Sequence, residues 1–198
     1  MLQVKVWGDR ACFTRPDFGT ERVSYEVMTP SAARGVLEAI FWKPQFRWEV
    51  KEIRVLNPVR RYSIVRNEVE SRQSHRRTEP YYADEDRAQR HTLMLRDVAY
   101  IVKAQIALQP EEDNAVKYLD QFRRRVRRGQ CFTQPYLGTR ECSAFFGPPD
   151  GDEVPIDLDH DLGLMLLDFD YEHRRPLLFD AKLERGVLRV PARQGSAA

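Results

Sequence analysis

Cysteine is scarce in this chain, and the arrangement of the few that occur excludes two classes of small domain. There are three cysteines, Cys12, Cys131 and Cys142, and no two of them have the close spacing of a zinc-binding pair. An odd number without such spacing argues against a disulfide-stapled domain and against a structural zinc site. We therefore expect free thiols, a reducing compartment and no bound metal.

Long apolar runs are also missing. No stretch approaches the ~20 residues needed to cross a bilayer, and the N-terminal residues lack the pattern of a secretory signal peptide. The sequence contains no Gly-x-Ser-x-Gly, Walker or dinucleotide-binding pattern, and it has only four histidines. We expect a cytoplasmic protein that has no membrane partner and no cofactor.

Lysine is the rarer cation, with 6 lysines against 26 arginines. Arginine binds phosphate through paired hydrogen bonds and stacks on bases, so this bias favours planar, phosphorylated ligands. The charge is also segregated: residues 150–184 hold eleven acidic and three basic side chains, a balance of −8, and because the whole chain carries +2 the rest carries +10. A basic body with an acidic C-terminal part is typical of nucleic-acid-binding proteins.

The densest cationic segment is 121–129, where arginine fills five of six consecutive positions. Guanidinium groups this close repel one another unless an anion lies beside them, and a helix dipole accounts for only one or two of them. Lys117, Gln121, Arg124 and Arg128 are spaced by four, three and four residues, which places them on one face of a helix. This face is predicted to bind a nucleic-acid backbone; the alternative is a solvated helix end.

Hydrophobic periodicity predicts the order strand, helix, strand, strand, helix, strand over the first 148 residues. Strands are expected at 2–7, 46–55, 98–108 and 139–146, and helices from Thr29-Pro30 to Pro44 and from Pro110 to Gly129. A change of parity within 46–55 indicates a β-bulge. The order is that of an α+β, ferredoxin-like (RRM-like) βαββαβ domain.

The remaining segments complete the predicted domain organisation. Residues 59–92 are polar and rich in arginine, so we expect a protruding hairpin or loop that is partly disordered without a ligand. Three apolar runs between residues 163 and 190, separated by turn residues, predict an appended small antiparallel β-sheet. We therefore expect a ferredoxin-like RNA-binding domain at 1–148 and a small C-terminal β-sheet domain at 149–198.

RNA cleavage without a metal requires a base for the 2′-hydroxyl proton, an acid for the leaving 5′-oxygen, and cations for the developing charge. Lys117, Tyr118 and Lys43 are the candidate catalytic residues; the alternative is that the lysines only contact phosphate and Tyr118 packs at the edge of the core. Trp42 is a candidate for stacking on a base, with a core position as its alternative. The candidate RNA-binding residues are Trp42, Arg34, Arg123, Arg124, Arg127, Arg128, Arg140 and His91.

An acidic stretch near the C-terminus supplies oxygen and nitrogen atoms that a divalent metal could use. Its members are Asp157, Asp159, His160, Asp161, Asp168, Asp170 and His173. No spacing among them matches a metal-binding motif, so a solvated acidic loop is the favoured interpretation. A metal-dependent nuclease is the weaker alternative.

Four segments, in order along nearly the whole chain, carry a family resemblance. They are VWGDRACFT at 6–14 with Ser24-Tyr25, TPSAARGVLEAIFWKP at 29–44, QRHT to LRDVAY at 89–100, and YLGTREC at 136–142, with a weaker echo in LGLM at 162–165, Phe169 and Tyr171. With these segments the sequence resembles the Cas-five family of CRISPR-associated proteins, in its type I-C (Dvulg, "d") subtype.

The resemblance implies a ferredoxin-like domain with a C-terminal three-stranded sheet, and a metal-independent endoribonuclease that acts on the repeat hairpin of precursor CRISPR RNA (crRNA). Such an enzyme cuts 3′ of the hairpin stem, leaves a 2′,3′-cyclic phosphate and stays on the 5′ handle as a subunit of the type I-C Cascade complex. Precursor crRNA and other Cascade subunits are thus the expected partners, and duplex DNA is a ligand that the same arginines would tolerate.

The resemblance also exposes two departures. Other family members use a tyrosine, a lysine and a histidine; here the tyrosine position holds Phe41, and the lysine–histidine pair falls on Val116 and Lys117, ahead of Tyr118. By this resemblance only Lys117 could serve in cleavage, at the histidine's position. The alternative function is a non-catalytic Cascade subunit that binds the crRNA handle.

Overall fold

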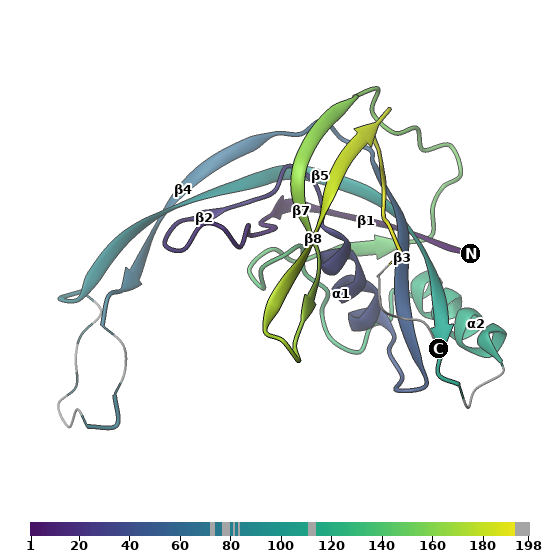
Figure 1. Cartoon of the computed structure of the whole chain (residues 1–198), viewed down its shortest axis with the longest axis horizontal. Helices are drawn as coiled ribbons and strands as arrows, with labels where there is room; N and C mark the ends of the chain where they lie inside the picture. The colour runs from purple at the N-terminus through teal and green to yellow at the C-terminus, as the bar shows by residue number, and fades with distance from the viewer. Residues whose placement is uncertain (72–73, 77–79, 81, 83, 111–113, 193–198) are drawn as a thin grey trace.

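A computed structural model describes residues 1–71, 74–76, 80, 82, 84–110 and 114–192. A curved, mainly antiparallel sheet forms the body of the molecule, two helices lie against it, and a long two-stranded arm sweeps away from it (Figure 1). The elements are β1 (Leu2–Ala11), β2 (Arg22–Val23), α1 (Pro30–Ile40), β3 (Phe46–Val55), β4 (Arg61–Val69), β5 (Arg87–Leu108), α2 (Ala115–Arg127), β6 (Phe145–Gly147), β7 (His160–Asp170), β8 (Arg175–Glu184) and β9 (Val187–Arg189).

The strands lie in the order β6-β1-β5-β3-β9-β8-β7, while β2 and β4 pair with β5 outside this path. The central strand, β5, is 22 residues long and is flanked in the body by β1 and β3, both antiparallel to it. The register of β3 against β5 shifts between Val50 and Glu52, which confirms the predicted bulge. The extra residue returns Ile53 and Val55 to the buried face that Trp48 and Val50 occupy.

Helix α1 begins as the sequence predicts and ends earlier. The Thr29 hydroxyl accepts a hydrogen bond from the amide of Ala32, and Pro30 occupies the first turn, where its missing N–H costs nothing. The prediction that the helix continues to Pro44 is wrong, because Phe41 is already extended, with φ −158° and ψ 123°. In that conformation the ring of Phe41 is buried and its carbonyl accepts a hydrogen bond from Trp48 Nε1.

Helix α2 also starts at a different residue from the one predicted. Asn114 is its N-cap, with its side chain accepting from the amides of Val116 and Lys117, so Pro110 does not begin the helix. The acidic residues 111–113, predicted for its first turn, lie outside the described residues. At the other end Gly129 adopts a φ of +61° directly after the C-cap and stops the helix as expected.

Both helices cover the same face of the sheet. Trp48 of β3 donates to the last turn of α1 through Phe41, and its ring lies 4.7 Å from that of Phe122 on α2. Phe122 and Val126 form the buried stripe of α2 together with Tyr118. The fold is therefore mixed, with a curled antiparallel sheet and two helices on one of its faces.

Two predictions about later strands are corrected. The strand expected at 139–146 shrinks to β6, which pairs with β1, because Gly138 at φ +89° turns the chain and the Leu137 amide donates to the Cys142 carbonyl across the turn. The predicted C-terminal strands are present as β7, β8 and β9. They do not form a separate sheet, since β9 pairs with β3 from Glu52↔Arg189 to Arg54↔Val187.

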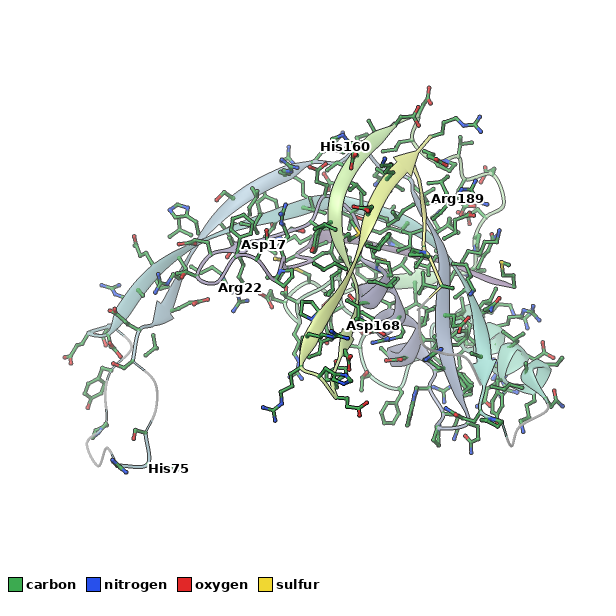
Figure 2. All side chains as sticks on the ribbon, in the orientation of Figure 1. Asp17, Arg22, His75, His160, Asp168 and Arg189 are labelled. Atoms are coloured by element: carbon green, nitrogen blue, oxygen red, sulfur yellow. The ribbon has the colours of Figure 1, made fainter. Side chains whose placement is uncertain are left out.

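The arm is a hairpin of β4 and the first part of β5, paired from Arg61↔Leu95 to Val69↔Arg87. It occupies much of the segment 59–92, and His75 marks its far end (Figure 2). The expectation of partial disorder falls on a tip where residues 72–73, 77–79, 81 and 83 lie outside the described residues. In the part of the chain that the structure describes, neither helix has the length and apolar character needed to cross a membrane.

Candidate nucleic-acid interface

The end of α1 and the outer face of α2 meet at one corner of the molecule, which we call the α1–α2 junction and define as Phe41, Trp42, Lys43, Lys117, Tyr118 and Arg125. Tertiary hydrogen bonds fix the end of α1 there. The Ala39 carbonyl accepts from the amide of Phe132 at 2.8 Å, and the Ile40 carbonyl accepts from the guanidinium of Arg125 at 2.9 Å. The orphan carbonyls of a helix end are thus satisfied by other parts of the chain, and the segment that follows is held in place.

Aromatic rings form the floor of the junction. The ring of Tyr118 lies 5.0 Å from that of Phe46 and 6.5 Å from that of Phe41. Tyr118 is 7% exposed and Phe41 is 1% exposed. The ring of Tyr118 therefore packs at the edge of the core, which was the alternative to a catalytic role in the sequence analysis.

Lys117 stands beside this floor. Its Nζ lies 4.6 Å from the centre of the Tyr118 ring, and the residue is exposed. The fold thereby brings Lys117 to the same cluster as Phe41, although 76 positions separate them in the sequence. A cation held over a ring at the surface can stabilise a phosphodiester or exchange a proton with it.

Trp42 and Lys43 follow α1 at the edge of the same corner. Trp42 is 54% exposed, so the alternative that it is a core residue does not hold. Lys43 is exposed as well, and its backbone carbonyl accepts from the amide of Phe46 to close the turn into β3. An exposed indole beside a lysine offers a stacking surface and a phosphate contact together.

The arginines of α2 differ in their surroundings. Arg123 pairs with Asp120 on the same helix at 3.0 Å. Arg124, Arg127 and Arg128 are exposed, and among the described residues no carboxylate lies within ion-pair distance of any of them. Three guanidinium groups without a carboxylate are the arrangement that an external polyanion neutralises.

Arg125, which sequence reasoning left out, anchors the junction. Besides its bond to Ile40, its guanidinium lies 5.2 Å from the centre of the Phe41 ring. Residue 125 is seven positions after Tyr118, two helical turns along the same face. That helical periodicity is the signal in the sequence that could have distinguished Arg125 from the other four arginines of the 123–128 run.

Three other predicted RNA-binding residues lie elsewhere. His91 is on the arm opposite Val65, and Arg140 is exposed on the turn before β6. Arg34 points from α1 to β7, where it pairs with Asp168 at 2.5 Å. The structure thus places Trp42, Lys43, Lys117 and Tyr118 at the junction and the four predicted arginines between 123 and 128 along α2 and its C-cap, and it leaves these three apart from both.

The acidic constellation does not assemble into one site. His160 pairs with Glu26 at 3.0 Å and His173 with Asp170 at 2.9 Å, while Asp168 is taken by Arg34. Figure 2 shows His160 and Asp168 far apart along β7. Within the described ranges no group of three or more His, Cys, Asp or Glu residues is placed to hold a metal ion.

Known proteins match this chain over nearly its whole length. The family model described as CRISPR-associated protein (Cas_Cas5), of the Cas5d type, matches residues 1–191. The chain is 46% identical to a CRISPR pre-crRNA endoribonuclease Cas5d of Thermus thermophilus, with 96% of this chain and 91% of that protein covered, and 42% identical to one of Mannheimia succiniciproducens, with 96% and 94% covered. A crystal structure of a CRISPR-associated protein, 25% identical, superposes with a TM-score of 0.73 over 98% of this chain and 92% of that one. The chain belongs to the Cas5d family of CRISPR-associated proteins.

Proposed function

We propose that this protein is an endoribonuclease that cuts the repeat hairpin of precursor crRNA. The observation that carries the proposal is the α1–α2 junction, where Lys117 lies over the Tyr118 ring and Lys43 follows an exposed tryptophan, together with three α2 arginines that have no carboxylate partner among the described residues. Relatives at 46% and 42% identity are named pre-crRNA endoribonucleases. The surface has the cations and the stacking group that a single-stranded RNA backbone requires.

The chemistry we propose uses the chain's own side chains and no metal. The 2′-hydroxyl attacks the adjacent phosphorus, the 5′-oxygen of the next nucleotide leaves, and a 2′,3′-cyclic phosphate remains. Lys117 stabilises the charge that develops on the phosphate oxygens and takes part in proton transfer. Lys43 and the α2 arginines hold the neighbouring phosphates, and Trp42 orients a base by stacking.

One observation favours a second function, a handle-binding subunit that does not cut. Phe41 stands where other family members have tyrosine, and it is buried with no hydroxyl. The neighbouring phenol belongs to Tyr118, which is itself mostly buried between aromatic rings. In this alternative the same cations bind the RNA, and no group positioned for proton transfer is required.

The order of four strands in the sheet supports a more specific description of the fold. The four strands β6-β1-β5-β3 are each antiparallel to their neighbours and, counted among themselves in chain order, lie as fourth, first, third and second. This is the order expected of a split βαβ, ferredoxin-like domain, with α1 and α2 as its helices. We propose such a domain for residues 1–148, with 149–198 as a C-terminal unit attached through β9.

We further propose that the protein stays on the 5′ handle after cleavage, as a cytoplasmic subunit of the type I-C Cascade complex. Family membership supports this assignment, and the projecting arm offers backbone and side chains for contacts outside the body. Duplex DNA is a further proposed ligand of the α2 arginines, because phosphate contacts carry no information about the sugar or the base.

The deciding experiment is a single-turnover incubation of the purified protein with labelled type I-C repeat RNA in EDTA. A matched RNA carries a 2′-deoxy residue at the cut site. Cleavage of the first RNA alone is expected and supports a metal-free mechanism through the 2′-hydroxyl. Tight binding of the intact RNA without cleavage would instead assign the handle-binding function.

The role of Lys117 makes a second test. Lys117→Ala is expected to slow single-turnover cleavage by ~10²-fold or more, because it removes a group that acts on the transition state. Lys182→Ala is the matched control, since Lys182 is an exposed lysine on β8, distant in the sheet from α2. Equal cleavage rates for wild type and Lys117→Ala would remove Lys117 from the mechanism.

A further inference from the structure

A cleft lies beside the first half of α1, away from the α1–α2 junction. One wall is α1 from Thr29 to Glu38, the second is the turn 136–138, and the third is the end of β7 with Tyr171 beyond it. Helix α1 rises about 16 Å over its eleven residues. The cleft therefore lies within a few nucleotides of the junction for a strand that follows the helix.

Three charged side chains meet inside the cleft. Arg34 donates to Asp168 at 2.5 Å, while its buried Nε lies 3.4 Å from Glu38 Oε1 and has no hydrogen-bond partner in the described structure. Two carboxylates, Glu38 and Asp168, thus lie against one guanidinium. Carboxylates in a cleft disfavour an anion such as a phosphate and favour a neutral group that donates hydrogen bonds.

Glu38 is the more exposed of the two carboxylates: its side chain is 36% exposed and lies 3.4 Å from Arg34 Nε, whereas that of Asp168 is 7% exposed. Burial raises the pKa of Glu38, Arg34 lowers it and the charge of Asp168 raises it again. An incompletely solvated carboxylate gains from a ligand that offers N–H groups, since charge-assisted hydrogen bonds are about twice as strong as neutral ones. Glu38 lines the cleft and can therefore accept hydrogen bonds from a ligand bound there.

The rim of the cleft is aromatic. Tyr171 is 77% exposed and Tyr136 is 42% exposed. The ring of Phe169 lies 5.1 Å from that of Tyr171 and supports it edge-on. Exposed rings at the mouth of a polar cleft provide stacking surfaces for a flat ligand.

The wall that carries Tyr136 is fixed. At Gly138 an added Cβ would lie 2.0 Å from the carbonyl oxygen of Cys12, and its φ is +89°, so this turn packs directly on the end of β1. The amide of Cys12 in turn donates to the carbonyl of Leu137 at 2.9 Å. The cleft is therefore preformed on this side and does not have to be organised by a ligand.

We propose that this cleft binds one unpaired guanine base of the repeat RNA. Guanine is flat, uncharged and presents two adjacent N–H donors, N1–H and the 2-amino group, which a single carboxylate accepts together. In this assignment Glu38 reads the base edge, Tyr171 and Tyr136 stack on its face, and Arg34 with Asp168 forms the floor. The inference rests on the proposed function, because it identifies a base-reading site for the same RNA.

The test uses the full-length protein and repeat RNAs in which each unpaired nucleotide is replaced, one at a time, by an abasic residue. Dissociation constants are measured for wild type, Tyr171→Ala and, as a control at another exposed tyrosine, Tyr82→Ala. At one guanine position the abasic change should weaken wild-type binding about tenfold. The same abasic change should weaken RNA binding by Tyr171→Ala less than about twofold. It should still weaken RNA binding by Tyr82→Ala about tenfold.

A second variant tests base identity without removing an aromatic surface. At the position found above, inosine lacks the 2-amino group of guanine, and it should weaken wild-type binding about fivefold. Glu38→Gln should bind guanine and inosine RNAs within about twofold of each other. Glu172→Gln, an exposed carboxylate next to Tyr171, is the matched control and should discriminate as wild type does.

The outcomes separate this inference from the function on which it rests. If wild type cleaves the repeat RNA, but the abasic penalties are the same in wild type and Tyr171→Ala at every position, the guanine site is overturned and the nuclease stands. Discrimination against inosine that survives in Glu38→Gln would also overturn the site. A wild-type protein that does not bind the repeat RNA would overturn both.

Discussion

Two sets of arginines in this protein have opposite surroundings. In the first set, on the sheet and α1, each guanidinium faces a carboxylate: Arg34 pairs with Asp168, Arg54 with Glu52 at 2.7 Å, and Arg66 with Glu68 at 2.7 Å. On α2 the described part of the structure places no carboxylate within ion-pair distance of Arg124, Arg127 or Arg128. Side chains of one type thus serve internal cohesion in one region and remain open to an external anion in the other.

Because arginines occur in both kinds of surroundings, a count of arginines cannot locate an RNA site. The net charge of +2 averages regions in which cations are already neutralised with regions in which they are not. The proposed binding face is distinguished by the absence, among the described residues, of carboxylates beside its guanidinium groups. The comparison predicts different effects for substitutions in the two groups.

The largest effect is expected inside the paired group. Asp168→Ala leaves the guanidinium of Arg34 partly buried, with Glu38 as its remaining anionic neighbour among the described residues, and should lower the free energy of unfolding by about 2–4 kcal/mol. Urea denaturation followed by circular dichroism measures this change. Glu184→Ala removes the partner of Arg189 in an exposed pair and should cost about 0.5 kcal/mol or less. Equal losses in both variants would erase the distinction between the two kinds of pair.

An intermediate effect, on binding and not on stability, is expected for α2. Changing Arg124, Arg127 and Arg128 together to Gln should weaken repeat-RNA binding about tenfold or more and should lower the slope of log K against log salt by ~2, since each lost phosphate contact contributes ~0.7. The free energy of unfolding should change little, because these residues have no carboxylate partners among the described residues.

The matched control removes the same charge from another region. Arg54 of β3, Arg189 of β9 and Arg185 in the turn before β9 are changed together to Gln. Filter binding over a range of salt concentrations should give a wild-type slope for this protein. A slope that falls equally in both triple variants would show that total charge, and not the α2 face, determines binding.

The smallest effect is expected for Glu38, which shares Arg34 with Asp168. Its pKa is raised in the folded protein, chiefly by burial, so the folded state binds a proton more tightly than the unfolded state does. Stability is therefore lost as pH rises from the unfolded pKa near 4.5 through the folded value. Glu38→Gln should stabilise the protein at neutral pH by less than about 1 kcal/mol, because the group is partly solvated, and should have no advantage below about pH 4.

Unfolding free energies measured between pH 4 and pH 8 test this sign. A Glu38→Gln protein that is less stable than wild type at pH 7 would contradict this prediction. It would mean that the attraction between Glu38 and Arg34 outweighs the cost of burying the Glu38 carboxylate. The same measurements on Glu172→Gln, an exposed carboxylate, should show no difference from wild type.

Local patterns predicted much of the fold. The Thr29 cap, the buried stripe of α1 and the bulge in β3 follow from residues that are close in sequence. The ends of elements were less predictable where distant contacts decide them. Phe41 leaves the helix because its ring and carbonyl are used by β3 and α2, and no periodicity within 29–44 contains that information.

The candidate site was predictable to a similar extent. Spacing alone placed Lys117, Gln121, Arg124 and Arg128 on one face of a predicted helix, and the structure has a helix there, with Arg128 as its C-cap. The same reasoning could not predict that Arg34 meets Asp168, because 134 positions separate them and the contact depends on where β7 lies. Charge pairing across a fold is a tertiary property, so cationic residues can be found in a sequence before it is known which of them are neutralised.

The 22-residue strand β5 bears on how the length of the arm can change in evolution. Its second half belongs to the core, whereas its first half is one side of the arm, and the hairpin is paired without a register shift from residue 61 to residue 95. Side chains alternate between faces with a period of two, so removing two residues from each strand shortens the arm and leaves every remaining side chain on its own face. Arm length can therefore be adjusted in fixed steps while the β1–β5–β3 core keeps its packing, and relatives that assemble with partners of different size can differ in the arm alone.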